Sequence, residues 1–192
     1  MPSHLDVNTQ RLLQFSIDVL DQALALVASV VASHEPPVDP DYATPVGAHL
    51  RHIIEHYEAL LCPAEPGSVD YDQRPRDREL EHQPAVARVR LEALQARLRK
   101  WPDAQLDALL QVRGLGGQAG DFDFAVSSSV GRELVFVASH AIHHYALLRA
   151  HCQQHGIPVS AQFGRAPGTV AHERSAMPRS PQLSSKVVPC ND

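Results

Sequence analysis

Two histidines near the end of the chain have the spacing of a metal-binding pair. His140 and His144 lie four residues apart within the stretch SVGRELVFVASHAIHHYALLRAHCQQHG, residues 129–156. Side chains at positions i and i+4 of a helix point the same way, one turn apart. Two imidazoles at this spacing can hold one divalent metal ion from a single helix.

A third ligand would have to come from another element, and a second group of histidines is available for this. His49, His52 and His56 follow one another at i, i+3 and i+7 beside an apolar seam. Helical phase alone places His49 and His56 slightly nearer that seam than His52. A lone histidine on a helix is usually an exposed side chain. Two histidine stripes beside the seams of two helices instead predict a shared internal site.

Other polar residues could support such a site. Glu133 and His151 share the stripe of His140 and His144, and Glu133 is a candidate orienter or base unless it pairs with Arg132 or a neighbouring helix. His49, His56 and His151 could line the cavity, whereas His143 is rotated by about 100° from His144 and is expected to take no part. The polar loop at 62–83 is either a solvated excursion or a lid whose Arg74 or Arg76 reaches an anionic ligand.

The apolar residues predict the elements that must position these histidines. They recur at alternating spacings of four and three, which is typical of amphipathic helices packed on a core. Thr44 and Pro45 are a typical helix start, and a serine near 127–129 is a typical N-cap. The alternating Phe122, Phe124 and Val126 predict a short hairpin with Val112 before the last helix. The helices are expected near residues 8–33, 45–61, 84–101 and 129–155.

Four such helices predict an all-α protein built as a four-helix bundle, a fold whose core often holds metal sites. The bundle is expected to span residues 1–173. Periodicity is lost after Gly156, although the segment FGRAPGTVA, residues 163–171, is a candidate to pack on the domain. Residues 174–192 are rich in Ser, Pro and Arg and are predicted to be a disordered tail.

The histidine motifs and their context resemble those of a known superfamily. The segment TPVGAHLRHIIEHYEALL, followed much later by RELVFVASHAIHHYALL, is similar to the DinB/YfiT-like superfamily of bacterial four-helix bundles. This resemblance implies a divalent metal, Zn²⁺ or Ni²⁺, bound by His52, His140 and His144. It also implies metal-dependent hydrolase or thiol S-transferase chemistry, with a low-molecular-weight thiol as a possible co-substrate.

Composition limits the environment and the partners. The 192 residues carry 17 basic and 22 acidic side chains, a net charge of −5, without the basic run expected of a nucleic-acid-binding protein. Three scattered cysteines indicate neither a disulfide framework nor a cysteine zinc site. No stretch is expected to span a membrane. The sequence therefore predicts a cytoplasmic protein acting on a small molecule, and the size of the bundle favours a homodimer.

Two functional classes follow from the site. In the first, three histidines hold a metal that keeps an open position, where a thiol or water becomes a nucleophile toward a small electrophile. The reaction would be S-transfer, isomerisation or hydrolysis. In the second, the protein is a non-enzymatic metal-binding or stress-response module whose ion stabilises the fold or senses metal. A closed shell of four protein ligands favours the second class.

Overall fold

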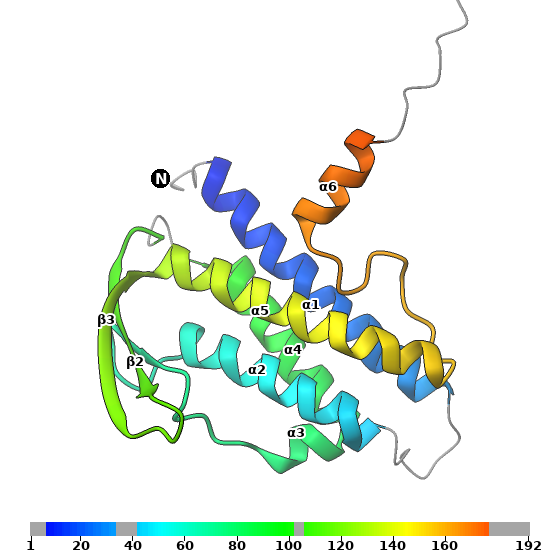
Figure 1. Ribbon diagram of the computed structural model, residues 1–192, viewed down its shortest axis with the longest axis horizontal. Helices are drawn as coiled ribbons and strands as arrows, with labels where there is room; N and C mark the ends of the chain where they lie inside the picture. The colour runs from blue at the N-terminus through cyan, green and yellow to red at the C-terminus, as the bar shows by residue number, and fades with distance from the viewer. Residues whose placement is uncertain (1–6, 34–41, 102–105, 177–192) are drawn as a thin grey trace, which may run out of the picture.

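The computed structural model describes residues 7–33, 42–101 and 106–176, and this part of the chain is mostly helical. Four long helices run alongside one another: α1 (Val7–Ser33), α2 (Ala48–Leu61), α4 (Pro84–Arg99) and α5 (Val130–Gln154). Figure 1 shows α5 and α2 side by side at the front, with α1 and α4 behind them. Each of the front helices contacts a rear helix, α5 with α1 and α2 with α4. The prediction of a predominantly helical protein is confirmed.

Apolar side chains between these helices form one continuous core. The predicted seams are buried, as Leu20 of α1, Leu50 of α2, Leu91 of α4 and Leu134 of α5 are each 0% exposed. Burying a leucine side chain contributes about 1.5–3 kcal/mol. The core therefore holds the long helices together through hydrophobic contacts that involve none of the histidines.

A small mixed sheet accompanies the helices, so the prediction of an all-α fold is wrong in this respect. Strands β2 (Leu109–Gly116) and β3 (Phe122–Ser129) form the predicted hairpin, with Val112 paired to Val126. A third strand, β1 (Ser68–Asp70), pairs in parallel with β2. Figure 1 shows the hairpin at the left of the helices, leading directly into α5. Ser129 then caps α5 by accepting a hydrogen bond from the Arg132 backbone N–H at 3.3 Å.

The segment at 62–83 has more structure than a solvated excursion. It contains β1 and a short helix, α3 (Arg78–His82), and it buries Val69 and Leu80 at 2% and 0% exposure. Asp77 caps α3, and its own backbone N–H donates to Glu55 of α2 at 2.7 Å. Val69 and Leu80 thus hold this highly charged segment against the helices. The composition of the segment did not reveal this packing.

Two helix boundaries also differ from the prediction. A π-helical segment, η1 (Tyr42–Gly47), contains Pro45, and α2 begins after it without a side-chain cap. A sixth α-helix, α6 (Pro167–Ala176), occupies a region where no element was predicted. Its first five residues belong to the segment 163–171 that was expected to pack on the domain, and Phe163 is indeed buried at 2% exposure. The predicted tail lies outside the described residues beyond Ala176.

Helix α1 is apolar enough to be a candidate membrane span, although no such stretch was expected from the sequence. Its segment Val7–Ala32 is long and apolar enough to cross a membrane, with an 18-residue window of mean hydropathy 1.7. The core helix of a soluble protein passes the same test, and α1 packs against α4 and α5 through buried residues such as Leu20 and Leu26. Length and composition alone are therefore weak evidence for a span.

Gly164 is held tightly against α5, which predicts a large cost for a side chain there. Its φ is +67°, its N–H donates to Gln22 at 3.0 Å, and an added Cβ would overlap the backbone of Tyr145 and Ala146. We expect Gly164→Ala to lower the free energy of unfolding by about 2–4 kcal/mol in urea titrations. Gly156 is a matched control, because it has the same φ of +67° and no atom within 4 Å of an added Cβ. Equal losses for both variants would contradict this account.

Candidate metal centre

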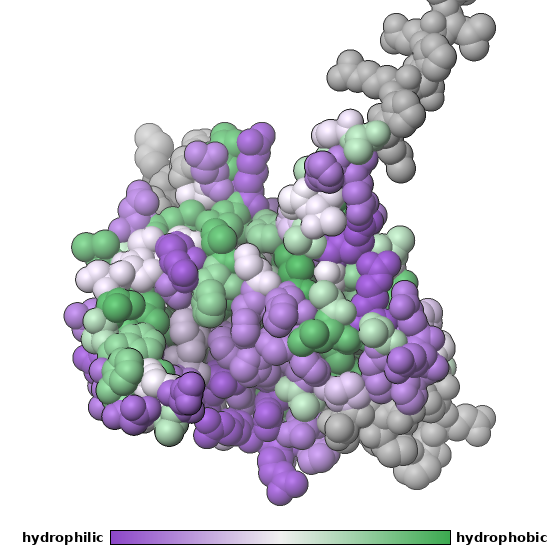
Figure 2. Space-filling view, in the orientation of Figure 1, coloured by the Kyte–Doolittle hydropathy of each residue, from purple (hydrophilic) through white to green (hydrophobic). Residues whose placement is uncertain are grey.

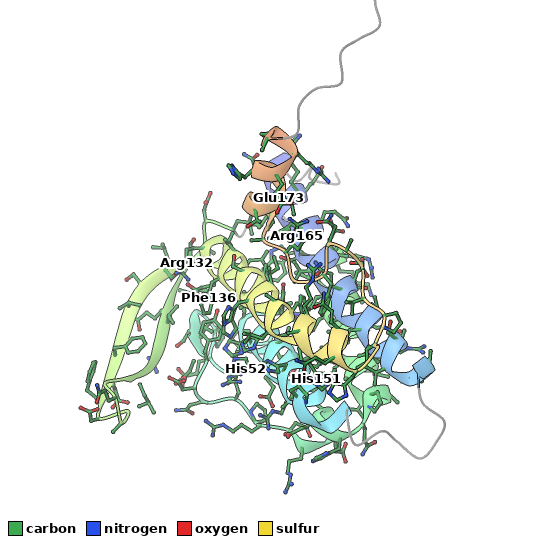
Figure 3. All side chains as sticks on the ribbon, turned by 45° about the vertical axis from the view of Figure 1, so that its right-hand side comes forward. His52, Arg132, Phe136, His151, Arg165 and Glu173 are labelled. Carbon is green, nitrogen blue, oxygen red and sulfur yellow. The ribbon has the colours of Figure 1, made fainter. Side chains whose placement is uncertain are left out.

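Three histidines from the two front helices meet at one point. Nε2 of His52 on α2 lies 2.8 Å from Nε2 of His140 on α5, and Nε2 of His144 lies 3.1 Å from the same His140 atom. One ligand atom from each residue can be chosen so that all lie within 4.8 Å of one another. These three side chains could hold a metal ion. Figure 3 shows His52 between the ribbons of α2 and α5.

The packing of α2 on α5 explains why residues 88 positions apart come together. The buried faces of both helices are mostly apolar, and the histidine stripes lie at the edge of that contact. His52, His140 and His144 are each partly buried rather than enclosed in the core. Their ring edges therefore meet where the core opens toward the surface.

The environment keeps these imidazoles neutral, which is the form that binds metal. Burial lowers the pKa of His52 to about 2, with His56 and Arg74 adding unfavourable positive charge. Burial lowers the pKa of His144 to about 3, with further contributions from His140 and His49. The pKa of His140 is also lowered, mainly by burial. A neutral imidazole has one nitrogen with a free lone pair, and a metal requires that lone pair. The Arg74 guanidinium can only donate to Nδ1 of His52, so in the metal-free chain this ring carries its proton on Nε2. Binding a metal through Nε2 therefore requires that the contact with Arg74 breaks.

Two more histidines touch this group from α2. Nδ1 of His49 lies 2.7 Å from Nδ1 of His144, so one of the two nitrogens donates to the other. His56 is 6% exposed, its Nδ1 donates to the His52 carbonyl at 2.6 Å, and its ring centroid lies 4.6 Å from that of His140. Both lie against the three histidines, in the positions from which a side chain orients a ligand.

The remaining histidines of α5 lie elsewhere. His143 is exposed, and its ring contacts His144 only edge-on at a centroid distance of 5.6 Å. His151, predicted as a possible cavity lining, stacks on His155 at 4.1 Å. Figure 3 places it nearer the C-terminal end of α5 than Phe136. The structure thus does not bring His151 to the group.

Glu133 is buried and its oxygens are already occupied. It accepts hydrogen bonds from Tyr71 Oη at 2.9 Å, from Ser128 Oγ at 2.6 Å and from Arg132 Nη1 at 3.0 Å. The pairing with Arg132 was one of the alternatives left open by the sequence. With three donors facing it, this carboxylate is suited to fixing Tyr71 in place. Its action as a base or orienter stays a prediction.

Tyr71 and Phe136 form an aromatic wall beside the histidines, which sequence reasoning missed. The Tyr71 ring stacks on His56 at 5.3 Å, and Phe136 stacks on His140 at 5.6 Å. Tyr71 and Phe136 also contact each other at 5.3 Å. Tyr71 comes from the charged segment after β1, so only the fold brings it here. Phe136 lies four residues before His140, so the two share one face of a helix. This spacing could have identified Phe136 from the sequence.

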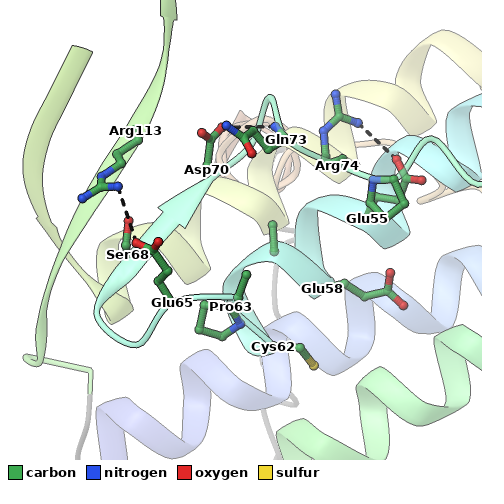
Figure 4. Close-up of a pocket in the computed structure, with 13 residues that line it drawn as sticks. Glu55, Glu58, Cys62, Pro63, Glu65, Ser68, Asp70, Gln73, Arg74 and Arg113 are labelled. Carbon is green, nitrogen blue, oxygen red and sulfur yellow. Dashed lines mark hydrogen bonds and ion pairs between the residues drawn. The ribbon is translucent and has the colours of Figure 1, made fainter. Parts of the chain in front are cut away.

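Arg74 links the histidines to a neighbouring pocket. Its Nη1 lies 2.8 Å from Nδ1 of His52 and 3.6 Å from Oε2 of Glu55, and its Nε donates to the Tyr71 carbonyl. Glu55 and Arg74 both line a pocket of about 350 Å³ between the end of α2 and strand β1. Figure 4 shows the Arg74–Glu55 ion pair at one side of this pocket. Of the two arginines predicted to reach an anionic ligand, Arg74 is therefore the one with a contact to His52, and its reach toward such a ligand stays a prediction.

Acid is expected to destabilise the metal-free protein because its buried histidines resist protonation. The pKa values of His52, His56 and His144 lie at about 2, 4 and 3, below the value of 6.5 for an exposed histidine. The unfolded chain therefore binds more protons than the folded one below about pH 6.5, and stability falls as the pH falls through that range. Urea midpoints at about pH 8 and about pH 5.5 test this.

The variant His52→Gln removes one of these groups and should show a shallower pH dependence than the wild-type chain. Both proteins should be treated with chelator, because bound metal would add its own pH dependence. Identical midpoints for the wild type at the two pH values would contradict the burial of neutral histidines.

The similarity of this chain to a known protein covers about half of its length. No protein-family model matches the chain, and no solved structure matches it significantly. Over 104 residues the chain is 33% identical to FK506-binding protein 5 of Rhizopus delemar. The aligned region is 54% of this chain but 27% of that protein. The aligned part of the chain thus spans about a quarter of the relative's length, and the FK506 binding in its name is a statement about that protein.

This result corrects the resemblance inferred from the histidine motifs. The predicted assignment to the DinB/YfiT-like superfamily is wrong, since the similarity found is to an FK506-binding protein and no match to that superfamily exists. Histidines at helical spacings are short patterns that unrelated helical proteins can share. A metal site in this chain is therefore indicated by the geometry of the histidines themselves.

Proposed function

We propose that His52, His140 and His144 bind one divalent metal ion, Zn²⁺ or Ni²⁺, in a metal-dependent enzyme acting on a small electrophilic substrate. The observation that carries the proposal is the convergence of three imidazole nitrogens from two packed helices. Chance pairs of histidines on one helix are common. A third from a facing helix, 88 residues away at 2.8 Å, is not expected without a common ligand.

The donor set fits such an ion. Two nitrogens bound to one Zn²⁺ at about 2.0–2.1 Å in a tetrahedral shell lie about 3.3 Å apart. The separations of 2.8 and 3.1 Å are close to that value, and the lowered pKa values keep all three rings neutral. An ion held by three imidazoles supplies Lewis-acid activation of a water or thiol at neutral pH.

The surrounding residues suit a small substrate with an anionic group. Tyr71 and Phe136 offer an aromatic surface beside His140, and Arg132 lies 5.3 Å from the Phe136 ring centroid. Arg74 adds a second guanidinium on the side of His52. Anions are bound by arginines of this kind, whereas flat apolar groups stack on the rings. S-transfer, isomerisation and hydrolysis of a small electrophile are all compatible with this lining.

The proposal also concerns how the four long helices are arranged. The four long helices act as a four-helix bundle in which α2 and α5 supply the metal ligands. The hairpin and the segment around β1 close one side of it and supply Tyr71 and Arg74. The bundle core provides rigidity, so the ligand positions are set by packing rather than by the ion.

Turnover by metal-loaded protein tests the enzymatic proposal. Protein loaded with one equivalent of Zn²⁺ or Ni²⁺ would be screened with pairs of a low-molecular-weight thiol and an electrophile, and with activated esters in the absence of thiol. We expect turnover that chelator removes and that the His140→Ala variant lacks. Turnover that survives both treatments, or a complete absence of metal-dependent turnover across the screen, would overturn the enzymatic proposal.

One observation favours a second candidate, a non-enzymatic metal-binding module. His49 and His56 stand directly against the three histidines, so a fourth imidazole is close at hand. If His49 or His56 completed a closed shell, the ion would stabilise or sense rather than catalyse. The number of histidine nitrogens around the bound metal separates the two candidates.

A further inference from the structure

Strand β3 has one edge without a strand partner among the residues that the structure describes. The strand order is β1-β2-β3, and all eight residues from Phe122 to Ser129 pair with β2 on the other edge. An unpaired edge presents a row of backbone N–H and C=O groups that can pair with another strand. Figure 1 shows β3 at the outer left margin of the molecule.

This edge also carries exposed apolar side chains. Phe122, Phe124 and Val126 project from the same face of β3 and are 56%, 38% and 53% exposed. Figure 2 shows hydrophobic surface gathered over the hairpin at the left, beside the more hydrophilic centre of the view. The two rings lie across glycines of β2, since a Cβ on Gly114 would come within 2.9 Å of the Phe124 ring and one on Gly116 would overlap the Phe122 ring. The result is a low, apolar surface next to an open edge.

The strand lacks the features by which exposed edges avoid pairing. Natural edge strands use proline, lysine, bulges or very short lengths to prevent it. The sequence FDFAVSSS contains no proline and no lysine, and its pairing with β2 is unbroken over eight residues. Asp123 is its only charged residue. The edge is therefore built to be paired rather than protected.

We propose that β3 pairs antiparallel with β3 of a second copy of this chain, forming a continuous six-stranded sheet across a two-fold axis. An axis at Phe124 sets Phe122 opposite Val126 and Asp123 opposite Ala125. Aromatic and β-branched side chains then face each other, which is a favourable cross-strand combination, and the two aspartates are not opposite one another. The same edge serves both copies, as a two-fold interface requires.

The contact between the two copies is short. With the axis at Phe124, residues 122–126 of each strand lie opposite one another over about 17 Å, and a contact about 20 Å wide along that length buries on the order of 340 Å² per copy. The total of about 700 Å² is below the roughly 1,000 Å² of a stable specific interface, so the dimer is a weak, reversible one. A contact of this size predicts dissociation constants of about 10–100 µM. The interface uses no residue of the histidine group. The dimer can therefore be tested independently of metal binding.

Sedimentation equilibrium between about 1 and about 100 µM tests the proposal on the full chain. We expect a reversible monomer–dimer equilibrium, weakened by at least about tenfold in the double variant Phe122→Lys, Val126→Lys. Leu147→Lys is the matched control, because Leu147 of α5 is similarly exposed at 52% and lies away from the sheet. It should leave the equilibrium unchanged, whereas a dimer formed through the exposed face of α5 would respond to it.

Hydrogen exchange of the wild-type chain provides a test that does not depend on the folding of a variant. Outward-facing amides of residues 122–126 should become more protected as the concentration rises through the dimer range, and helix amides should not. A wild-type chain that stays monomeric at 100 µM would overturn the proposal. So would a dimer that persists in the β3 variant, or one that is lost in Leu147→Lys.

Discussion

The variant His140→Ala is expected to lose the bound metal. His140 Nε2 lies within 2.8 Å of His52 and 3.1 Å of His144, so it is the central member of the group. Removing one of three ligands leaves two, and even residues that only orient ligands change metal affinity by about 10–100-fold. We expect a loss of affinity of more than about 100-fold, measured by competition with a chromophoric chelator, with helix content unchanged.

The same experiment separates ligands from neighbours. His52→Ala and His144→Ala should lose the metal as His140→Ala does. His49→Ala and His56→Ala should retain the ion with affinity reduced by about 10–100-fold, less than in the ligand variants, and His143→Ala should be unaffected because that side chain is exposed. Full occupancy in His52→Ala, together with loss in His49→Ala or His56→Ala, would show that the third ligand comes from another turn of α2.

Chelation is expected to abolish turnover while leaving the fold largely intact. The long helices are held by fully buried side chains such as Leu20, Leu50 and Leu91, and none of these contacts needs the ion. Circular dichroism should change little on treatment with chelator, and activity should return when one equivalent of metal is added. Cooperative unfolding on chelation would instead identify a structural ion, as in small zinc domains that are unfolded without metal.

The parts of the fold that follow simple periodicity could be predicted from the sequence. The helix predicted near 8–33 is Val7–Ser33, and that near 129–155 is Val130–Gln154. The alternation of Phe122, Phe124 and Val126 correctly predicted a hairpin. In each case the apolar residues recur at the period of the element, about 3.6 residues for a helix and 2 for a strand. This periodicity is the most direct structural signal in a sequence.

Elements stabilised by few long-range contacts were missed. Strand β1 is three residues long and exists because it pairs with β2, whereas α3 depends on the buried Leu80 and the Asp77 cap. Such pairings join distant residues and leave no local period. The supporting side chains Tyr71 and Glu55 were missed for the same reason, since both reach their partners only through the packing of this segment on α2.

The three candidate ligands show both the value and the limits of short motifs. The i, i+4 spacing placed His140 and His144 on one face of α5 correctly, because helix geometry fixes that relation. Helical phase left His49, His52 and His56 open, and the structure brings Nε2 of His52 to 2.8 Å from Nε2 of His140 while His49 and His56 flank the group. The superfamily assignment drawn from the same motifs was wrong.

Metal analysis combined with X-ray absorption spectroscopy tests the central claim most directly. The chain would be purified without a nickel column, loaded with Zn²⁺ and freed of excess ion. The account predicts one ion per chain, bound by three imidazole nitrogens and at least one oxygen from solvent, and no ion retained by His140→Ala. Absence of stoichiometric binding, or a closed shell of four protein ligands, would contradict an open three-histidine metal centre at His52, His140 and His144.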